Sequence, residues 1–142
     1  MADERVVAIK LEQIEQYHGE LTAKQAALSR SEFLKSTTQQ RAVERMFENA
    51  IQACPDLAQH VATRDFGYNG STAKEAVRVL YRNGVVDEAT MSTLVAAIGF
   101  RNVLAHEYGH VDPETVYETL QNGLGMYDTY SQQVAEWVRD DE

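Results

Sequence analysis

The residues with the clearest chemical potential are an arginine, a histidine and a tyrosine that lie within eight positions of one another. Arg101, His106 and Tyr108 occur in a stretch that reads GFRNVLAHEYGH. The guanidinium of arginine suits a phosphoryl group because it is planar, stays charged and can donate two parallel hydrogen bonds. The imidazole of histidine can both accept and release a proton near neutral pH. The combination predicts acid–base chemistry on a phosphate, and the alternative is a structural hydrogen-bond cluster at a helix end.

Helix geometry constrains how these side chains can meet. Each residue of an α-helix turns the chain by about 100° and advances it by about 1.5 Å. Asn102 and His106 then share one face, where the amide can orient the imidazole, whereas Arg101 and His106 diverge by roughly 140°. We therefore expect the pair to reach one phosphate only if the helix loosens near His106 or if a second copy of the chain completes the site.

The rest of the chain predicts helices, apart from one loop at residues 64–71. Apolar residues recur at spacings of three, four or seven, as in helices that bury one face. We predict five helices, over about residues 7–28, 31–63, 72–81, 87–109 and 113–138. Gly123 and Gly125 lie inside the last of these and predict either a bend or a close neighbour. The predicted fold is all-α, an up-and-down bundle in a single domain over residues 1–142.

Composition limits the class of protein. The chain has 142 residues, of which 44% are hydrophobic and 25% charged, as expected for one globular domain with a core. We find no apolar run long enough for a membrane span and no pattern of a secretory signal. The one cysteine, Cys54, has the surroundings of a small buried hydrophobic residue and leaves no cysteine-based metal site. We expect a cytoplasmic protein with no cofactor, no metal site and no membrane partner.

The net charge of −9 is unevenly distributed along the chain. Residues 86–142 carry eleven acidic and two basic side chains, which disfavours tight binding of RNA through its phosphates. One basic stripe stands out, at spacings of four residues: Lys74, Arg78 and Arg82. If RNA is bound, we predict that these three side chains contact its backbone.

The segment GFRNVLAHEY resembles the Arg-x4-His-x-Tyr signature of the HEPN superfamily, and in particular of HepT-like toxins. The preceding turn YRNGVVDEAT, the following segment HVDPETVYETL and the all-helical order are also similar to that family. The resemblance thus covers nearly the whole chain. It implies a bundle that forms a homodimer or a higher homo-oligomer, with two copies of the motif facing each other across a cleft.

The same resemblance implies roles for individual residues. Arg101 and His106 would be the catalytic pair of a metal-independent RNA endonuclease, the toxin of a two-gene module, with Asn102 supporting the motif. Tyr108 would be the residue that the antitoxin, a minimal nucleotidyltransferase of the MntA type, adenylylates. The alternative is a non-catalytic helical subunit that binds or regulates the nucleotidyltransferase. The acidic C-terminal third suits such a protein interface.

Overall fold

The computed structural model describes residues 2–106 and 111–140, and every regular element in this part of the chain is a helix. Seven helices follow one another: α1 (Glu4–Ala27), α2 (Arg30–Lys35), α3 (Thr37–Phe66), α4 (Ala73–Arg82), α5 (Glu88–His106), α6 (Pro113–Asn122) and α7 (Gly125–Asp140). The predicted all-α class is confirmed. The predicted number of five helices is wrong, because two of the predicted helices are each divided in two. None of the described helices has the length and hydrophobicity needed to cross a bilayer.

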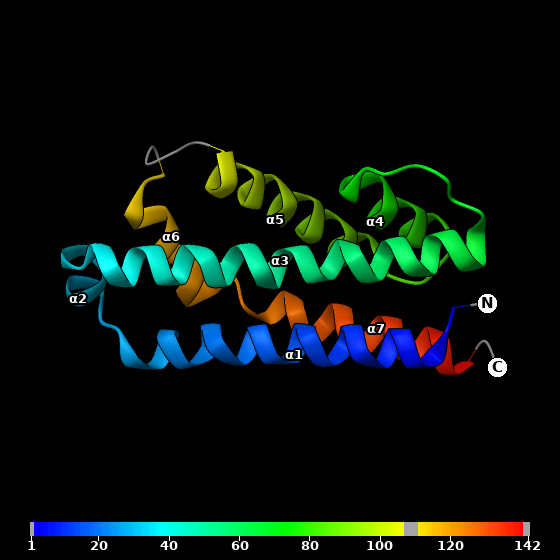
Figure 1. The fold of residues 1–142 in the computed structure, drawn as a ribbon, viewed down its shortest axis with the longest axis horizontal. Helices are drawn as coiled ribbons and strands as arrows, with labels where there is room; N and C mark the ends of the chain where they lie inside the picture. Colours follow the sequence, from blue (N-terminus) through cyan, green and yellow to red (C-terminus); the bar gives the residue numbers. More distant parts are fainter. Residues whose placement is uncertain (1, 107–110, 141–142) are drawn as a thin grey trace.

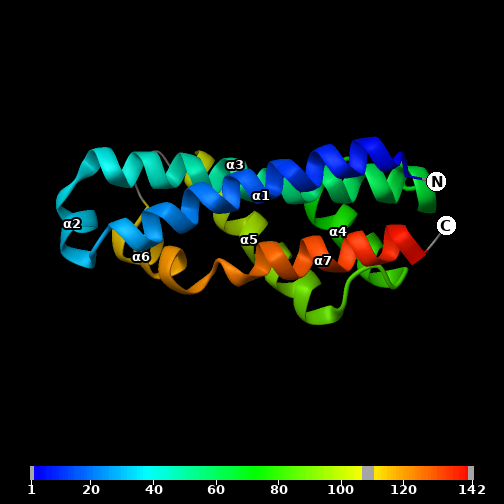
Figure 2. The ribbon, with the colours of Figure 1, turned by 90° about the horizontal axis from the view of Figure 1, so that it is seen from below.

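The long helices alternate in direction, so the bundle is of the up-and-down kind (Figure 1). α1 and α5 run one way and α3 and α7 the other, so that α1 begins and α7 ends at the same end of the molecule (Figures 1 and 2). α3 is the central helix and contacts α1, α2, α4, α5 and α6. α5, the helix that carries Arg101 and His106, is held between α3, α4 and α7.

The first unpredicted break separates α2 from α3 at Ser36. Ser29 opens α2 with a capping box, in which its hydroxyl accepts from the N–H of Glu32 and the Glu32 carboxylate accepts from the N–H of Ser29. Ser36 opens α3 in a similar way, because its hydroxyl accepts from the N–H of Gln39. Serine favours helix starts because its oxygen satisfies a backbone donor that has no partner inside the helix. Ser29 therefore begins α2, and Ser36 both ends α2 and begins α3.

The second unpredicted break lies between α6 and α7. α6 ends at Asn122, Gly123 follows it, and α7 begins at Gly125. A Cβ atom placed on Gly123 would lie 2.8 Å from the carbonyl oxygen of Thr119. The glycine is thus needed for a close approach, and the chain turns into a new helix instead of bending a continuous one.

The core holds α5 and α7 against α3. Tyr130 of α7 is fully buried, and its hydroxyl donates to the carbonyl of Cys54 in α3 at 2.7 Å. Cys54 is itself buried, and burial raises the pKa of its thiol, so it is a small core residue as predicted. Phe100 of α5 packs edge-on against Phe47 of α3, with ring centroids 5.6 Å apart. These contacts fix the position of the residues that follow Phe100.

Candidate functional site

The last turns of α5 carry the motif on a helix whose earlier turns face the core. Leu94 and Ile98 are buried, and Arg101 follows them at helical spacing, so its aliphatic stem continues the same stripe. Arg101 is half-buried, and its Nε atom is buried without a hydrogen-bond partner among the described residues. A buried donor without a partner is unfavourable for folding. The stability of the bundle therefore does not by itself account for an arginine at this position.

The guanidinium of Arg101 turns toward the face of α5 that carries His106. Nη2 of Arg101 donates to Oδ1 of Asn102 at 2.8 Å. Asn102 and His106 are four residues apart and lie on one side of the helix. α5 remains helical through His106, so the loosening of the helix that would let the two side chains meet is absent from its described turns. The Asn102 amide oxygen, which the sequence analysis placed beside the imidazole, instead accepts a hydrogen bond from the arginine.

His106 is the last residue of α5, and its side chain is exposed. Neither His106 nor Arg101 is enclosed in the interior of the bundle, so both remain accessible to a ligand. Tyr108, the predicted modification site, lies outside the described residues. Within the described part of the chain, no three His, Cys, Asp or Glu side chains form a group suited to a metal ion.

The groups that surround the guanidinium of Arg101 differ from those that surround five other arginines of the described chain. Carboxylates within ion-pair distance balance five arginines of the described chain: Arg30, Arg41, Arg45, Arg78 and Arg82. The hydrogen-bond partner of Arg101 is the neutral amide of Asn102, and no described carboxylate forms an ion pair with it. A guanidinium held by a neutral partner keeps its full charge for an incoming anion.

The basic stripe predicted on α4 is divided between two environments. Glu75 pairs with Arg82 and lies 3.8 Å from Arg78. The hydrogen bond from Arg82 holds the pKa of the Glu75 carboxyl below its ordinary value, so the carboxylate stays charged between the two arginines. Lys74 points elsewhere, because its Nζ lies 3.7 Å from the position that a Cβ atom of Gly99 would take on α5. Of the three residues of α4 that were predicted to contact RNA, Lys74 therefore extends toward α5, the helix that carries the motif.

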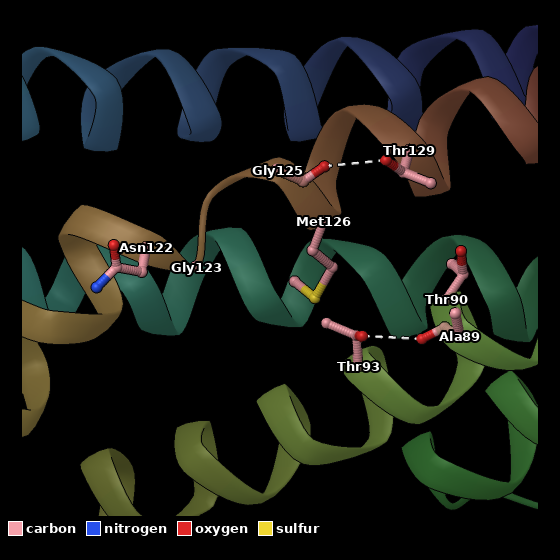
Figure 3. A pocket seen from close by; sticks show the side chains of 8 residues that line it. All are labelled: Ala89, Thr90, Thr93, Asn122, Gly123, Gly125, Met126 and Thr129. Atoms are coloured by element: carbon pink, nitrogen blue, oxygen red, sulfur yellow. Dashed lines mark hydrogen bonds between the residues drawn. The ribbon is translucent and has the colours of Figure 1, made fainter.

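The sequence did not predict a hollow between α5 and the junction of α6 and α7 (Figure 3). Met126 of α7 and Thr93 of α5 point toward each other across it (Figure 3). The pocket has a volume of about 280 Å³ and is lined by Ala89, Thr90, Thr93, Asn122, Gly123, Gly125, Met126 and Thr129. An adjoining pocket of about 240 Å³ shares Thr93, Gly123 and Met126 with it and extends to Phe100, next to Arg101. The two glycines were the available signal, since each removes a side chain from the hollow.

Comparison with known protein families identifies the chain. A family model described as "Ribonuclease HepT-like" matches residues 10–134, a span that includes α4, α5 and the whole Arg-x4-His-x-Tyr motif. The chain belongs to the HepT-like ribonuclease family. The resemblance inferred from the motif and its flanking segments is thereby confirmed.

Two relatives of this HepT-like chain are named for different RNAs. The tRNA nuclease HepT of Aphanizomenon flos-aquae (strain 2012/KM1/D3) is 26% identical over 133 residues, which cover 94% of this chain and 90% of that protein. The mRNA nuclease HepT of Shewanella oneidensis is 21% identical over 100 residues, which cover 70% of this chain and 75% of that protein. Family membership therefore leaves the class of RNA open.

The fold agrees with solved structures of toxin–antitoxin complexes. The tri-AMPylated HEPN toxin of Shewanella oneidensis, solved in complex with an MNT antitoxin, superposes with a TM-score of 0.85 at 18% identity. The match covers 94% of this chain and 99% of that toxin. A chain from the crystal structure of a toxin–antitoxin complex with AMP-PNP gives a TM-score of 0.84 at 17% identity, with coverage of 94% of this chain and 99% of that chain. At these identities the likeness shows that the HepT-like chain shares the fold of the two matched chains.

Proposed function

We propose that this HepT-like chain is the toxin of a toxin–antitoxin module and an RNA endonuclease that uses Arg101 and His106. The observation that carries the proposal is the state of Arg101: its guanidinium is half-buried, held by a neutral amide and turned toward the face of His106. The family match and the nuclease names of the two relatives support it.

The proposed reaction is an internal attack on the RNA backbone. His106 takes the proton from a ribose 2′-hydroxyl while the 2′-oxygen forms a bond to the adjacent phosphorus. The bond between phosphorus and the 5′-oxygen breaks, and that oxygen takes up a proton from the imidazolium or from water. Arg101 stabilises the charge that develops on the non-bridging oxygens. The products are a 2′,3′-cyclic phosphate and a 5′-hydroxyl, and the scheme uses no metal ion.

We further propose that two copies of the chain build the cleft, as the resemblance to the HEPN superfamily implies. Val103 supports this arrangement, because it is 42% exposed and lies one turn before His106 on α5. An exposed aliphatic side chain beside the exposed imidazole suits a surface that a second copy covers. A homodimer would also bring together the Arg101 of one copy and the His106 of the other.

The replacement His106→Ala tests the ribonuclease proposal. We expect it to lower the rate of RNA cleavage by about 10²–10⁴-fold, the usual contribution of a general base. Because His106 is exposed, the variant should keep the thermal unfolding midpoint of the wild type. Cleavage of total cellular RNA by purified protein, with analysis of the new 3′ ends for cyclic phosphate, gives the measurement. A folded His106→Ala protein that cleaves as fast as the wild type would contradict the proposal.

Control by the antitoxin is proposed to act through Tyr108. The phenolic oxygen would attack the α-phosphorus of ATP bound to a minimal nucleotidyltransferase, and pyrophosphate would leave. The added AMP would carry negative charge on a residue seven positions after Arg101 in the sequence, where it would compete with RNA phosphates for the guanidinium. Incubation with the partner enzyme and ATP should add the mass of one or more AMP groups to the wild type and none to Tyr108→Phe. Modification of Tyr108→Phe to the same extent would refute this assignment.

The hollow beside Met126 favours a second function, that of a non-catalytic subunit which binds the nucleotidyltransferase. It is an open pocket of about 280 Å³ next to a more apolar one, as a docking side chain requires. Under this function the wild type cleaves no RNA, and Met126→Glu weakens binding of the nucleotidyltransferase. Cleavage that disappears in both Arg101→Ala and His106→Ala would exclude it.

A further inference from the structure

We infer that Lys74 is a substrate-positioning residue that binds the RNA phosphate next to the scissile one, at the place where α4 lies against Gly99 of α5. The inference rests on the proposed ribonuclease function. It adds a phosphate contact from a helix that lies outside the Arg-x4-His-x-Tyr motif, and it separates Lys74 from the other two basic residues of α4.

The position of the Lys74 ammonium places it on the motif's side of α5. Its Nζ lies 3.7 Å from the site of a Cβ atom on Gly99. Gly99, Asn102 and His106 are three and four residues apart, so they occupy one face of α5. Along the helix axis, Gly99 precedes Asn102 by about 4.5 Å and His106 by about 10 Å. One face of α5 therefore presents, in order, the ammonium of Lys74, the Asn102-bound guanidinium and the imidazole.

The charge of Lys74 has no balance in the described part of the molecule. The side chain is half-buried, and no described carboxylate forms an ion pair with it. Its neighbour Glu75 is engaged by Arg78 and Arg82. Lys74 also lies in the first turn of α4, where the positive end of the helix dipole disfavours a cation. A phosphate at this point would relieve both unfavourable features.

Gly99 borders the ammonium of Lys74. A glycine inside a helix lowers its stability relative to alanine, so the residue is a local cost to α5. A larger side chain at this position would occupy the volume in which the Lys74 Nζ lies. Two features that burden the fold, an unbalanced lysine on α4 and a glycine inside α5, thus meet at one point. The binding of a backbone phosphate at that point accounts for the unbalanced lysine.

The direct test measures RNA affinity in the non-cleaving His106→Ala background, with a short fluorescent oligouridylate as the probe. Lys74→Met should raise the dissociation constant roughly tenfold, as expected for the loss of one charge-assisted hydrogen bond. The slope of log affinity against log salt should fall by about 0.7, the value for one phosphate contact on a single strand. Lys74→Arg should retain most of the affinity. Lys35→Met is the matched control, since it removes an exposed lysine from α2, which does not pack against α5.

The decisive result is the comparison of Lys74→Met with Lys35→Met. If both bind the probe with the same affinity and the same salt slope, the inference about Lys74 is overturned, whether or not the wild type cleaves RNA. If the wild type cleaves no RNA but Lys74→Met still binds the probe more weakly than its control, the proposed reaction fails and the phosphate contact stands.

Kinetics separates a positioning role from a structural one. In the cleaving protein, Lys74→Met should raise KM roughly tenfold and change kcat by less than about twofold, because a ground-state contact is lost. The wild type should bind a substrate with one uncharged methylphosphonate linkage beside the cleavage site more weakly than the all-phosphate substrate. Lys74→Met, which has already lost the contact, should bind the two substrates with equal affinity. A fall in kcat with unchanged KM would overturn the assignment.

Gly99→Met offers an independent route to the same contact, because it displaces the Lys74 ammonium and keeps the lysine. It should weaken RNA binding about as much as Lys74→Met, and the double variant should be no weaker than either single variant. Fully additive effects would show that the two residues do not share a site and would overturn the inference. Thermal unfolding of each variant confirms that the comparison is made on folded protein.

Discussion

Two neighbouring helices each carry arginines, and they hold them in opposite ways. On α4, Arg78 and Arg82 share the carboxylate of Glu75 at the surface. On α5, Arg101 is half-buried and bonded to the neutral amide of Asn102. On α4 one carboxylate at an exposed surface offsets one of the two arginine charges, whereas the described partner of Arg101 carries no charge and leaves the guanidinium able to bind an anion. The proposed anion site on α5 therefore rests on the partner of each basic residue and not on the number of basic residues in a helix.

Within the comparison of α4 with α5, the largest effect should come from changing the head group of the α5 arginine. Arg101→Lys keeps the charge but loses the planar group that can hold Asn102 and a phosphate at once, and we expect kcat to fall by about 10²-fold. Single-turnover cleavage measures it. Arg41→Lys, on an exposed arginine of α3 that pairs with Glu44, is the control and should retain full activity. An Arg101→Lys protein as active as this control would mean that charge alone suffices on α5.

A smaller loss is expected if α5 is made to resemble α4. Asn102→Asp places a carboxylate beside Arg101 with almost no change in shape. RNA binding and cleavage should weaken roughly tenfold, because the new carboxylate forms an ion pair with the guanidinium and competes with the RNA phosphate. The measurement is RNA affinity over a range of salt concentrations. Asn69→Asp, at an exposed loop position, changes the net charge equally and should have little effect. If both variants behave alike, net charge and not the partner of Arg101 governs binding.

The smallest effect should follow the reverse change, in which α4 is made to resemble α5. Glu75→Gln releases Arg78 and Arg82, and RNA binding should become severalfold tighter, with a salt slope steeper by about 0.7 for each phosphate newly contacted. Glu136→Gln, at an exposed position of α7, is the control for the change in net charge. An unchanged slope in Glu75→Gln would place the outer face of α4 away from the path of the RNA.

The helical class and the motif could be predicted because their signals are local. Leu94, Ile98 and Arg101 are four and three residues apart, so their common helical face can be predicted from the sequence of α5 alone. The break at Ser36 was missed because the polar stretch KSTTQQRA contains neither glycine nor proline. The break at Gly123 was missed because the two glycines were interpreted as a bend or a close neighbour inside one helix. In each case a backbone group decides the break: a capped N–H after Ser36, and the close approach of Gly123 to the carbonyl of Thr119.

By itself, the sequence determined that the chain is helical, which face of α5 is buried and that an arginine, an asparagine and a histidine lie near its end. The bond from Arg101 to Asn102 and the pairs that Glu75 forms with Arg78 and Arg82 lie within single helices. Only the tertiary structure decided that Lys74 of α4 extends across to Gly99 of α5. The physical reason is that helical periodicity depends on neighbours in the chain. The surroundings of the Lys74 charge depend instead on which groups of another helix lie within a few ångströms of it after the helices have packed.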